Sequence, residues 1–409
     1  MTNAHNAGQK WLTVVGIGED GVAGLGDEAK RAISAAAHVF GGKRHLTLAA
    51  ELIRGEARAW PTPFDNEMRD IVALRGQKVC VLASGDPFFH GVGVTLARQV
   101  ATSDMHVLPA ASAFSLAASR LGWALQDVET VSLHGHAIDL IRPLLQPGAR
   151  IIALTSDGEA PAQIAELAAN SGFGGSRLIV LEALGGGNER IREAIAGAFD
   201  VQNINPLNVL ALEIESSPQA RILPLACGIA DDLFEHDGQI TKREIRAMTL
   251  STLAPRRGEL LWDIGAGSGS ISIEWMLCHP SLQAIAIEHN AERAERIARN
   301  ASACGVPGLK LVRGAAPAAL AGLPMPEAIF IGGGGSDSGV FDAAIAALRP
   351  GGRLVANAVT LEMEALLLAR HAALGGELLR LQVSRAAPVG SMTGWRPAMP
   401  VTQWSWVKP

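Results

Sequence analysis

The chain alternates short apolar runs with amphipathic stretches along nearly its whole length. Runs such as WLTVVGI, KVCVLAS, RIIAL, RLIVLE and NVLALE have the length of buried strands, and the stretches between them carry apolar residues at helical spacing. Strands that alternate with helices predict an α/β fold with mostly parallel sheets, because parallel neighbours need a crossover connection. The last run, VTQWSWV, has an alternation of apolar and polar residues that fits an antiparallel strand pair at a sheet edge.

The most informative stretch is the glycine-rich turn in WDIGAGSGSISIEW. An apolar run is followed by glycines at alternate positions, Gly265, Gly267 and Gly269, and then by helix-forming residues. This order predicts a buried strand, a tight turn and a helix N-terminus whose free N–H groups favour an anionic group. A second strand about twenty residues on ends in Glu288, which is placed to accept hydrogen bonds from a ribose.

The spelling of this turn indicates its ligand. A dinucleotide fold uses GxGxxG, whereas this turn is GxGxG and follows Asp263, whose carboxylate suits an ammonium group better than a pyrophosphate. The pattern is typical of enzymes that use S-adenosylmethionine (SAM). It favours SAM over a nicotinamide dinucleotide and over a glycine turn without a ligand.

Composition narrows the classes of protein. A chain of 409 residues is long for one domain, and 48% apolar with 18% charged residues indicates compact globular domains. The net charge of −5 argues against a nucleic-acid-binding protein. No apolar run approaches the roughly twenty residues of a membrane span, and the polar start MTNAHNAGQK lacks the apolar core of a signal peptide. We therefore expect a cytoplasmic protein that does not bind membranes.

Neither a metal site nor a disulfide is indicated. The cysteines lack CxxC spacing and are expected to be buried or inert thiols. They are Cys80, Cys227, Cys278 and Cys304. His134 and His136 could form a metal pair on one strand face, but no third ligand is evident, which favours loop or cleft-lining histidines.

The amino-terminal half carries a different set of loop motifs. GIGEDG formally spells GxGxxG, but the helical pattern begins only at Asp27, and Glu19 and Asp20 would repel a pyrophosphate. A loop against another ligand, or a plain strand-to-helix connection, fits better. SGDPFFHG and LPAASAF follow with the same order of strand and turn, and Ser112 stands where a helix begins.

In order and spelling, GIGEDG, SGDPFFHG, LPAASAF, SLHGH and EALGGGNERI resemble the signatures of the tetrapyrrole (corrin and sirohaem) methylases over residues 11–215. Within that family they are most similar to the cobalamin-pathway methylase that acts on C5. The resemblance implies two α/β lobes, divided near residues 112–125, with SAM in the cleft between them. By family position, its contacts would come mostly from the backbone of Gly16, Gly18, Gly85, Asp86, Phe88, Ser112 and Leu184.

The motifs ITKREIRA, DIGAGSGS, AIEHN, VRGAAPAAL and IFIGGGG closely resemble the cobalamin-pathway methyltransferase that acts at C15 and removes an acetate carboxyl. This resemblance covers residues 236–409 and implies a Rossmann-like class I SAM methyltransferase domain. Relatives often carry an acidic residue near the adenine amine where this chain has Ala315. That contact must then come from the backbone of Ala315 and Ala316, or be absent. Thr241 is a further cofactor-site candidate.

We therefore expect a bifunctional methyltransferase with one SAM molecule in each of two domains. Residues 1–215 form the bilobal methylase, residues 216–235 lose periodicity and form a linker, and residues 236–409 form the second domain. Thr241 and Glu244 have capping-box spacing, which predicts that the first helix of the second domain begins at Thr241.

The resemblance implies a reduced precorrin as substrate, methylated at C5 and C15 with loss of the ring C acetate carboxyl. A cobalt-precorrin, another tetrapyrrole, an unrelated small molecule or a non-enzymatic SAM-binding regulator stay open as alternatives. Methyl transfer can be catalysed by positioning, so no catalytic residue is assigned. An acidic protein needs local cations to hold a polycarboxylate. The candidates are Lys242, Arg243, Arg246, Arg385 and Arg396. We also expect a homo-oligomer.

Overall fold

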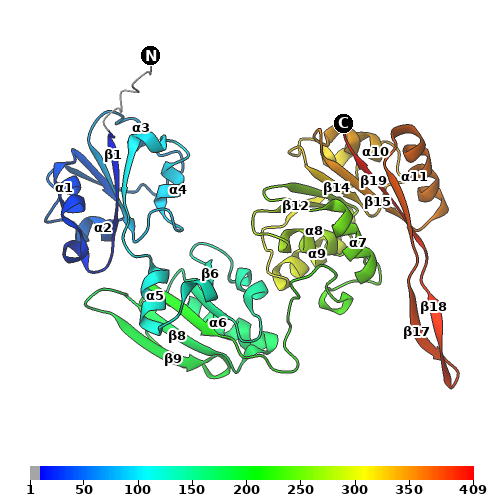
Figure 1. Ribbon diagram of the computed structural model, residues 1–409, viewed down its shortest axis with the longest axis horizontal. Coiled ribbons are helices and arrows are strands. Elements are labelled where there is room, and N and C mark those ends of the chain that lie inside the picture. The colour runs from blue at the N-terminus through cyan, green and yellow to red at the C-terminus, as the bar shows by residue number, and fades with distance from the viewer. Residues whose placement is uncertain (1–9) are drawn as a thin grey trace, which may run out of the picture. The chain divides into compact units, whose positions relative to one another are not determined.

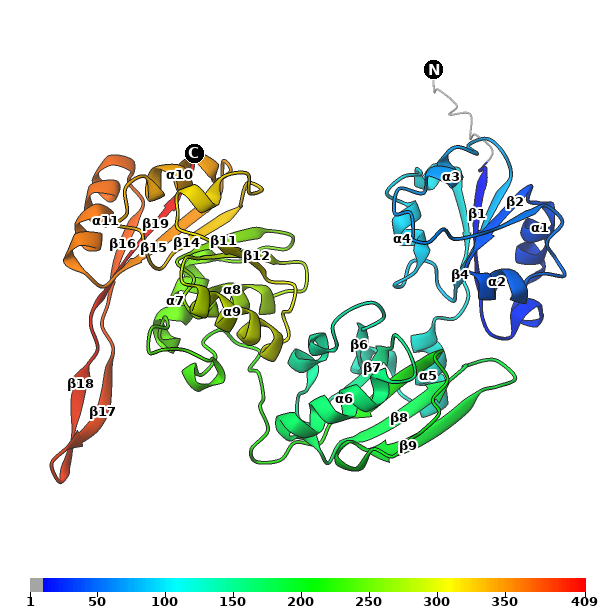
Figure 2. The ribbon, with the colours of Figure 1, turned by 180° about the vertical axis from the view of Figure 1, so that it is seen from behind.

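The computed structural model describes residues 10–409, so the polar start of the chain lies outside the described residues apart from Lys10. The chain forms two compact units (Figures 1 and 2). The amino-terminal unit comprises the residues up to Ile138 together with Gln146–Ala220, and the carboxy-terminal unit comprises Asp139–Leu145 and Arg221–Pro409. Within the described residues, no helix has both the length and the apolar character needed to cross a lipid bilayer.

The first lobe of the amino-terminal unit is a five-stranded parallel sheet in the order β3-β2-β4-β1-β5. Its strands are β1 (Leu12–Ile17), β2 (His38–Gly41), β3 (Glu56–Ala59), β4 (Val79–Ser84) and β5 (Met105–Leu108). Its helices are α1 (Asp27–Ala35), α2 (Lys43–Leu48), α3 (Arg69–Val72) and α4 (Val92–Leu96). Val81 and Leu82, neighbours on β4, belong to different core clusters because both faces of this sheet are covered.

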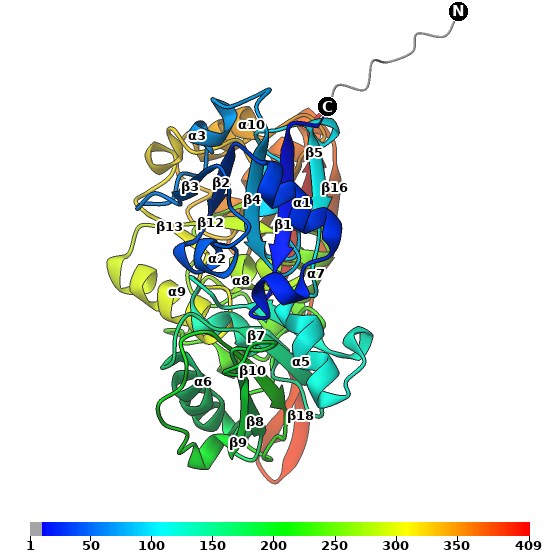
Figure 3. The ribbon, with the colours of Figure 1, turned by 90° about the vertical axis from the view of Figure 1, so that its left-hand side faces the viewer.

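The second lobe contains a mixed sheet in the order β6-β7-β10-β8-β9, of which Figure 3 labels β7, β8, β9 and β10. Its strands are β6 (Glu129–Ser132), β7 (Arg150–Leu154), β8 (Arg177–Glu182), β9 (Arg190–Ile195) and β10 (Asn208–Glu213). Its helices are α5 (Ala113–Leu121) and α6 (Ala160–Ala168). The Ser112 hydroxyl caps α5 by accepting a hydrogen bond from the Ser115 N–H at 3.1 Å, which confirms the predicted helix start.

The carboxy-terminal unit is built on a seven-stranded sheet in the order β13-β12-β11-β14-β15-β19-β16. Its strands are β11 (Leu260–Ile264), β12 (Gln283–Glu288), β13 (Lys310–Arg313), β14 (Ala328–Ile331), β15 (Arg353–Ala358), β16 (Glu377–Leu381) and β19 (Val401–Val407). Its helices are α7 (Arg243–Leu253), α8 (Ser270–Leu277), α9 (Ala291–Ala303), α10 (Val340–Ala347) and α11 (Leu361–Leu374). The predicted antiparallel pair is confirmed, since β19 pairs antiparallel with both β15 and the edge strand β16.

A two-stranded ribbon, here called the arm, extends from this sheet (Figures 1 and 2). It consists of β17 (Ser384–Val389) and β18 (Met392–Pro397), paired antiparallel. Val389, Met392 and Trp395 on the arm are 63%, 77% and 77% exposed. The arm therefore presents large apolar side chains to solvent.

Two expectations about the entry to the carboxy-terminal unit are wrong. Helix α7 begins at Arg243 with Lys242 as N-cap and no side-chain capping bond, because the Glu244 carboxylate pairs with Arg385 and is not available for a capping box with Thr241. The stretch expected to be a linker is also packed in its second part. Its residues Leu223, Ile229 and Phe234 are buried in one cluster with Ile273 of α8, so apolar packing fixes this stretch to the unit.

Candidate functional site

One cavity, with a volume of about 760 Å³, lies in the carboxy-terminal unit. The residues that follow β11, β12, β14 and β15 line it, together with the start of α7 and the base of the arm. The carboxyl ends of parallel strands meet at one edge of a sheet, where α/β proteins bind their ligands. The predicted cofactor residues Thr241, Gly265, Gly267, Glu288, Ala315 and Ala316 all line this cavity.

Each of the three positions in the turn requires glycine, but for different structural reasons. All have a positive φ, of 71° at Gly265, 62° at Gly267 and 76° at Gly269. A Cβ at Gly265 would lie 2.4 Å from the Gly333 carbonyl oxygen, and one at Gly269 would lie 2.8 Å from the Ile297 side chain. A Cβ at Gly267 would meet only the Gln239 oxygen, at 3.7 Å. Packing therefore requires the outer two glycines, whereas Gly267 presents bare backbone to the cavity.

Glu288 is fixed to the glycine turn from the end of the neighbouring strand. One carboxylate oxygen accepts from the Gly267 N–H and the other from the Asn290 N–H, each at 2.9 Å. The side chain is only 2% exposed, yet it lines the cavity. Glu288 thus stabilises the turn and presents a carboxylate where a ribose is expected.

Asp263 does not line the cavity, contrary to its predicted contact with an ammonium group. It is 1% exposed and accepts two hydrogen bonds from Ser272, one from the N–H at 3.1 Å and one from the hydroxyl at 2.7 Å. Its other carboxylate oxygen is buried without a partner. Burial raises the pKa of Asp263 from its ordinary value of 3.8 to about 6, despite the bonds from Ser272. Asp263 therefore fixes the start of α8 beneath the turn.

Because the pKa of Asp263 is raised, the free energy of unfolding should depend on pH through this carboxyl group. The folded state binds this proton more tightly than the unfolded state, so the stability that Asp263 contributes is full below pH 4 and is lost above pH 6. We expect the stability of Asp263→Asn, relative to the wild type, to increase by up to about 3 kcal/mol between pH 4 and pH 7. Urea unfolding of both proteins at several pH values measures this difference. A difference that does not vary with pH would contradict the prediction.

Only some of the five basic residues expected to bind the substrate line the cavity. Lys242 and Arg385 line the cavity, whereas Arg243 and Arg396 do not. Arg246 is fully buried, so its assignment as a substrate contact is wrong. It donates hydrogen bonds to Glu274 and to the backbone oxygens of Thr241 and Ile229. A helical position read from sequence alone could not show that this side chain points inward.

Asn357, at the end of β15, is a cavity residue that sequence reasoning missed. A polar residue near the end of a buried strand, as in GGRLVANAV, is the signal that could have found it. Apolar side chains line the cavity as well, and they include Ile245, Val359, Val383, Met399 and Val401.

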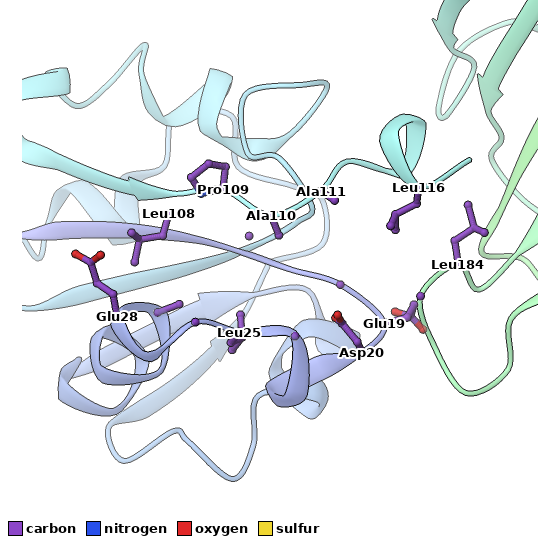
Figure 4. A pocket seen from close by; sticks show the side chains of 16 residues that line it. Glu19, Asp20, Leu25, Glu28, Leu108, Pro109, Ala110, Ala111, Leu116 and Leu184 are labelled. Atoms are coloured by element: carbon purple, nitrogen blue, oxygen red, sulfur yellow. The ribbon is translucent and has the colours of Figure 1, made fainter. Parts of the chain in front are cut away.

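A second cavity, of about 440 Å³, lies in the amino-terminal unit between residues of its two lobes (Figure 4). The predicted residues Gly16, Gly18 and Leu184 line it, and so do the three carboxylates Glu19, Asp20 and Glu28. Glu19 already pairs with Arg44 and Glu28 contacts His106 at 2.9 Å, so these two attract a cationic ligand, such as a sulfonium or ammonium group, less strongly than free carboxylates would.

The other predicted residues of this unit support the cavity from outside it. A Cβ at Gly16 would lie 1.9 Å from the Gly85 carbonyl oxygen, so two loops meet on bare backbone. Asp86 accepts a hydrogen bond from the Phe88 N–H at 2.8 Å, and Ser112 caps α5. Gly85, Asp86, Phe88 and Ser112 are not among the residues that line the cavity.

Two cysteines lie close together in space although they are far apart in the sequence. Cys80 and Cys304 are buried, but Cys227 and Cys278 are exposed, with sulfur atoms 3.7 Å apart. The His134 Nδ1–H donates to the Thr155 carbonyl at 3.1 Å. Over residues 10–409, no three His, Cys, Asp or Glu side chains are grouped to hold a metal ion.

Comparisons with known proteins give consistent matches for both halves. A family model for tetrapyrrole (corrin/porphyrin) methylases matches residues 11–199, and one for a precorrin methyltransferase domain matches residues 232–408. A protein of Sinorhizobium sp, named precorrin-6Y C(5,15)-methyltransferase (decarboxylating), is 66% identical over 97% of this chain and 96% of its own length. A protein of Mycobacterium tuberculosis with the same name is 40% identical over 97% of this chain and 100% of its own length.

A shorter relative matches part of the chain. The cobalt-precorrin-6B C(15)-methyltransferase (decarboxylating) of Salmonella typhimurium is 37% identical over 42% of this chain and 91% of its own length.

Proposed function

Since the chain belongs to the precorrin-6Y C(5,15)-methyltransferases (decarboxylating), we propose that it methylates a reduced precorrin at C5 and C15 and removes one acetate carboxyl. As a methyltransferase it uses SAM as methyl donor. The observation that carries the proposal is the presence of one glycine-lined cavity in each unit. We assign one SAM molecule to each cavity, C5 methylation to the amino-terminal unit, and C15 methylation with decarboxylation to the carboxy-terminal unit.

The residues of both cavities fit SAM. The Gly265–Gly269 turn offers bare backbone and Glu288 offers ribose acceptors, while the amino-terminal cavity offers carboxylates to a cationic ligand. When bound, SAM supplies an electrophilic methyl group to an electron-rich meso carbon of the macrocycle. The apolar side chains that line the cavity exclude water from the bound substrate. Lys242 and Arg385 supply local positive charge for carboxylates that do not react.

The proposed function is tested with the full chain, SAM and reduced precorrin-6. We expect a product that has gained two methyl groups and lost carbon dioxide, detected by mass spectrometry and by release of labelled carbon dioxide. The same assay with the cobalt-containing substrate decides whether a cobalt-precorrin is used instead. No methyl transfer to either substrate would contradict the proposal.

Arg385 and Arg396 form a matched pair for testing substrate binding. They face each other in the register of the arm, but only Arg385 lines the cavity. Because Arg385 is about half exposed and already pairs with Glu244, its contact with a substrate carboxylate is worth about 0.2–1 kcal/mol. We expect Arg385→Ala to raise KM at C15 by up to about fivefold and Arg396→Ala to leave KM unchanged. Equal effects of the two changes in steady-state kinetics would contradict this role.

We further propose that the arm joins copies of this chain into a homo-oligomer. An isolated two-stranded ribbon is marginally stable in water, and the arm has exposed strand edges and exposed Val389, Met392 and Trp395. A second copy of the arm would cover both features through a two-fold contact. We expect the double change Met392→Ser with Trp395→Ser to lower the mass measured by light scattering. An unchanged mass would exclude the arm as the interface.

A further inference from the structure

A buried network of three polar side chains holds Asn357 at the rim of the larger cavity. Asn357 on β15 and Gln403 on β19 are direct register partners, and Thr249 projects toward them from α7. The Asn357 Nδ2 donates to the Thr249 hydroxyl at 2.9 Å, and the Gln403 Nε2 donates to the Asn357 Oδ1 at 2.9 Å. Thr249 and Gln403 are 0% and 2% exposed, whereas Asn357 is half-buried and lines the cavity.

The contacts of the network give the direction of the Asn357 amide. The Gln403 Nε2 faces Asn357 and also donates to the Thr249 hydroxyl at 3.2 Å, while the Gln403 Oε1 lies 2.9 Å from the Thr252 hydroxyl, which also donates to the Met248 carbonyl. The bond from the Gln403 Nε2 in turn requires an oxygen on the near side of Asn357 and places Nδ2 toward Thr249. An amide nitrogen has two N–H groups, and Thr249 accepts only one of them. One N–H of Asn357 is therefore left to serve a ligand in the cavity.

Asn357 differs from the cations of the cavity in carrying no charge. Lys242 and Arg385 line the same cavity, and the Arg385 guanidinium is paired with Glu244. Polar side chains are costly to bury unless they are paired, so the two buried partners of this amide, Thr249 and Gln403, indicate a requirement for a fixed orientation. Asn357 thus combines neutrality with a fixed orientation.

We propose that Asn357 orients the acetate carboxylate that is lost during the carboxy-terminal reaction, an inference that rests on the proposed function. In this step the bond between the acetate carbon and its carboxylate breaks and carbon dioxide leaves. The electron pair of that bond neutralises the positive charge that C15 methylation places on the conjugated macrocycle. A guanidinium at this carboxylate would stabilise its charge before reaction and oppose the loss. A single neutral N–H can orient the acetate carboxylate without stabilising its charge as strongly before reaction.

The test uses the full chain and compares labelled carbon dioxide released with methyl groups transferred to C15. We expect Asn357→Asp, which is isosteric but repels a carboxylate, to lower this ratio on the order of 10- to 100-fold. Thr249→Val, which removes the acceptor of the Asn357 amide, should lower the ratio less, and Thr249→Ser should restore it. Thr249 is a positioning residue in this proposal because it acts through Asn357.

The measured ratio distinguishes a wrong role for Asn357 from a wrong proposed function. A ratio that stays at the wild-type value in Asn357→Asp and Thr249→Val, even when both rates fall, would overturn the role of Asn357. The ratio is independent of the amount of folded protein, so partial unfolding of either variant cannot imitate the expected result. If Asn357→Asp is too unstable to assay, the contrast between Thr249→Val and Thr249→Ser decides. Failure of the wild type to methylate reduced precorrin would instead contradict the proposed function.

Discussion

Replacing Gly267 by valine is expected to abolish SAM binding at the carboxy-terminal cavity and to leave the amino-terminal cavity intact. The φ of 62° at Gly267 lies in the left-handed region, which costs an L-residue roughly 1–2 kcal/mol and a β-branched residue more. The added side chain would also project where the backbone lines the cavity. C15 methylation and carbon dioxide release should therefore disappear while C5 methylation continues.

Isothermal titration with SAM measures this result directly. We expect two sites in the wild type and one in Gly267→Val. Gly258→Val is the matched control, because Gly258 has a φ of 82°, has no atom within 4 Å of an added Cβ, and does not line the cavity. It carries the same kind of backbone strain without blocking the ligand. Retention of both sites in Gly267→Val, or a single site in the wild type, would contradict the assignment of one SAM molecule to each unit.

Replacing Arg246 by alanine is expected to destabilise the carboxy-terminal unit by about 3–5 kcal/mol. Arg246 and Glu274 are 0% and 2% exposed, and their ion pair links α7 to α8. Glu274 also accepts from the backbone N–H groups of Gly228 and Ile229, at 2.6 Å and 3.0 Å. Removing the guanidinium would leave a buried carboxylate without its counter-ion. Because Ile240 and Thr241 of the adjoining segment line the cavity, SAM binding there should fail as well.

Thermal and urea unfolding measure the loss of stability, and Arg243→Ala is the control. Arg243 is exposed on the same helix, so its removal should change stability by no more than about 0.5 kcal/mol. The double change Arg246→Met with Glu274→Gln should recover much of the loss, since it removes both charges together. If Arg246→Ala unfolds like the wild type, the buried ion pair is not needed for folding.

The helices and strands were largely predictable because the sequence pattern within each element indicates its type. Apolar runs between amphipathic stretches identified the strands and helices, and Ser112 correctly identified the start of α5. The alternation of VTQWSWV predicted antiparallel pairing of β19 because alternate residues of a strand face opposite sides of the sheet. The start of α7 was predicted wrongly because a capping box depends on where Glu244 finds its partner, and that partner is Arg385, far along the chain.

The cavity lining was predicted most completely where it consists of backbone. The glycine turn was located because glycine spacing reports backbone geometry, and the residues after β13 were located through the family resemblance. Side-chain roles were less accessible. Asp263 and Arg246 were expected at the ligand, yet both are buried, because the inward or outward direction of a side chain is decided by tertiary packing. Asn357 was missed because its orientation depends on partners from α7 and β19.

The arm leaves and rejoins the sheet at directly opposite positions, since Leu381 of β16 and Val401 of β19 are register partners. An insertion placed there can be lengthened, shortened or lost in one genetic event without shifting the register of any sheet strand. A tight two-residue turn would suffice to close the same pair of strands. Evolution could therefore have altered the arm without rebuilding the strands of the sheet that line the larger cavity. The distal residues of the arm should vary in length among relatives far more than the strands that it connects.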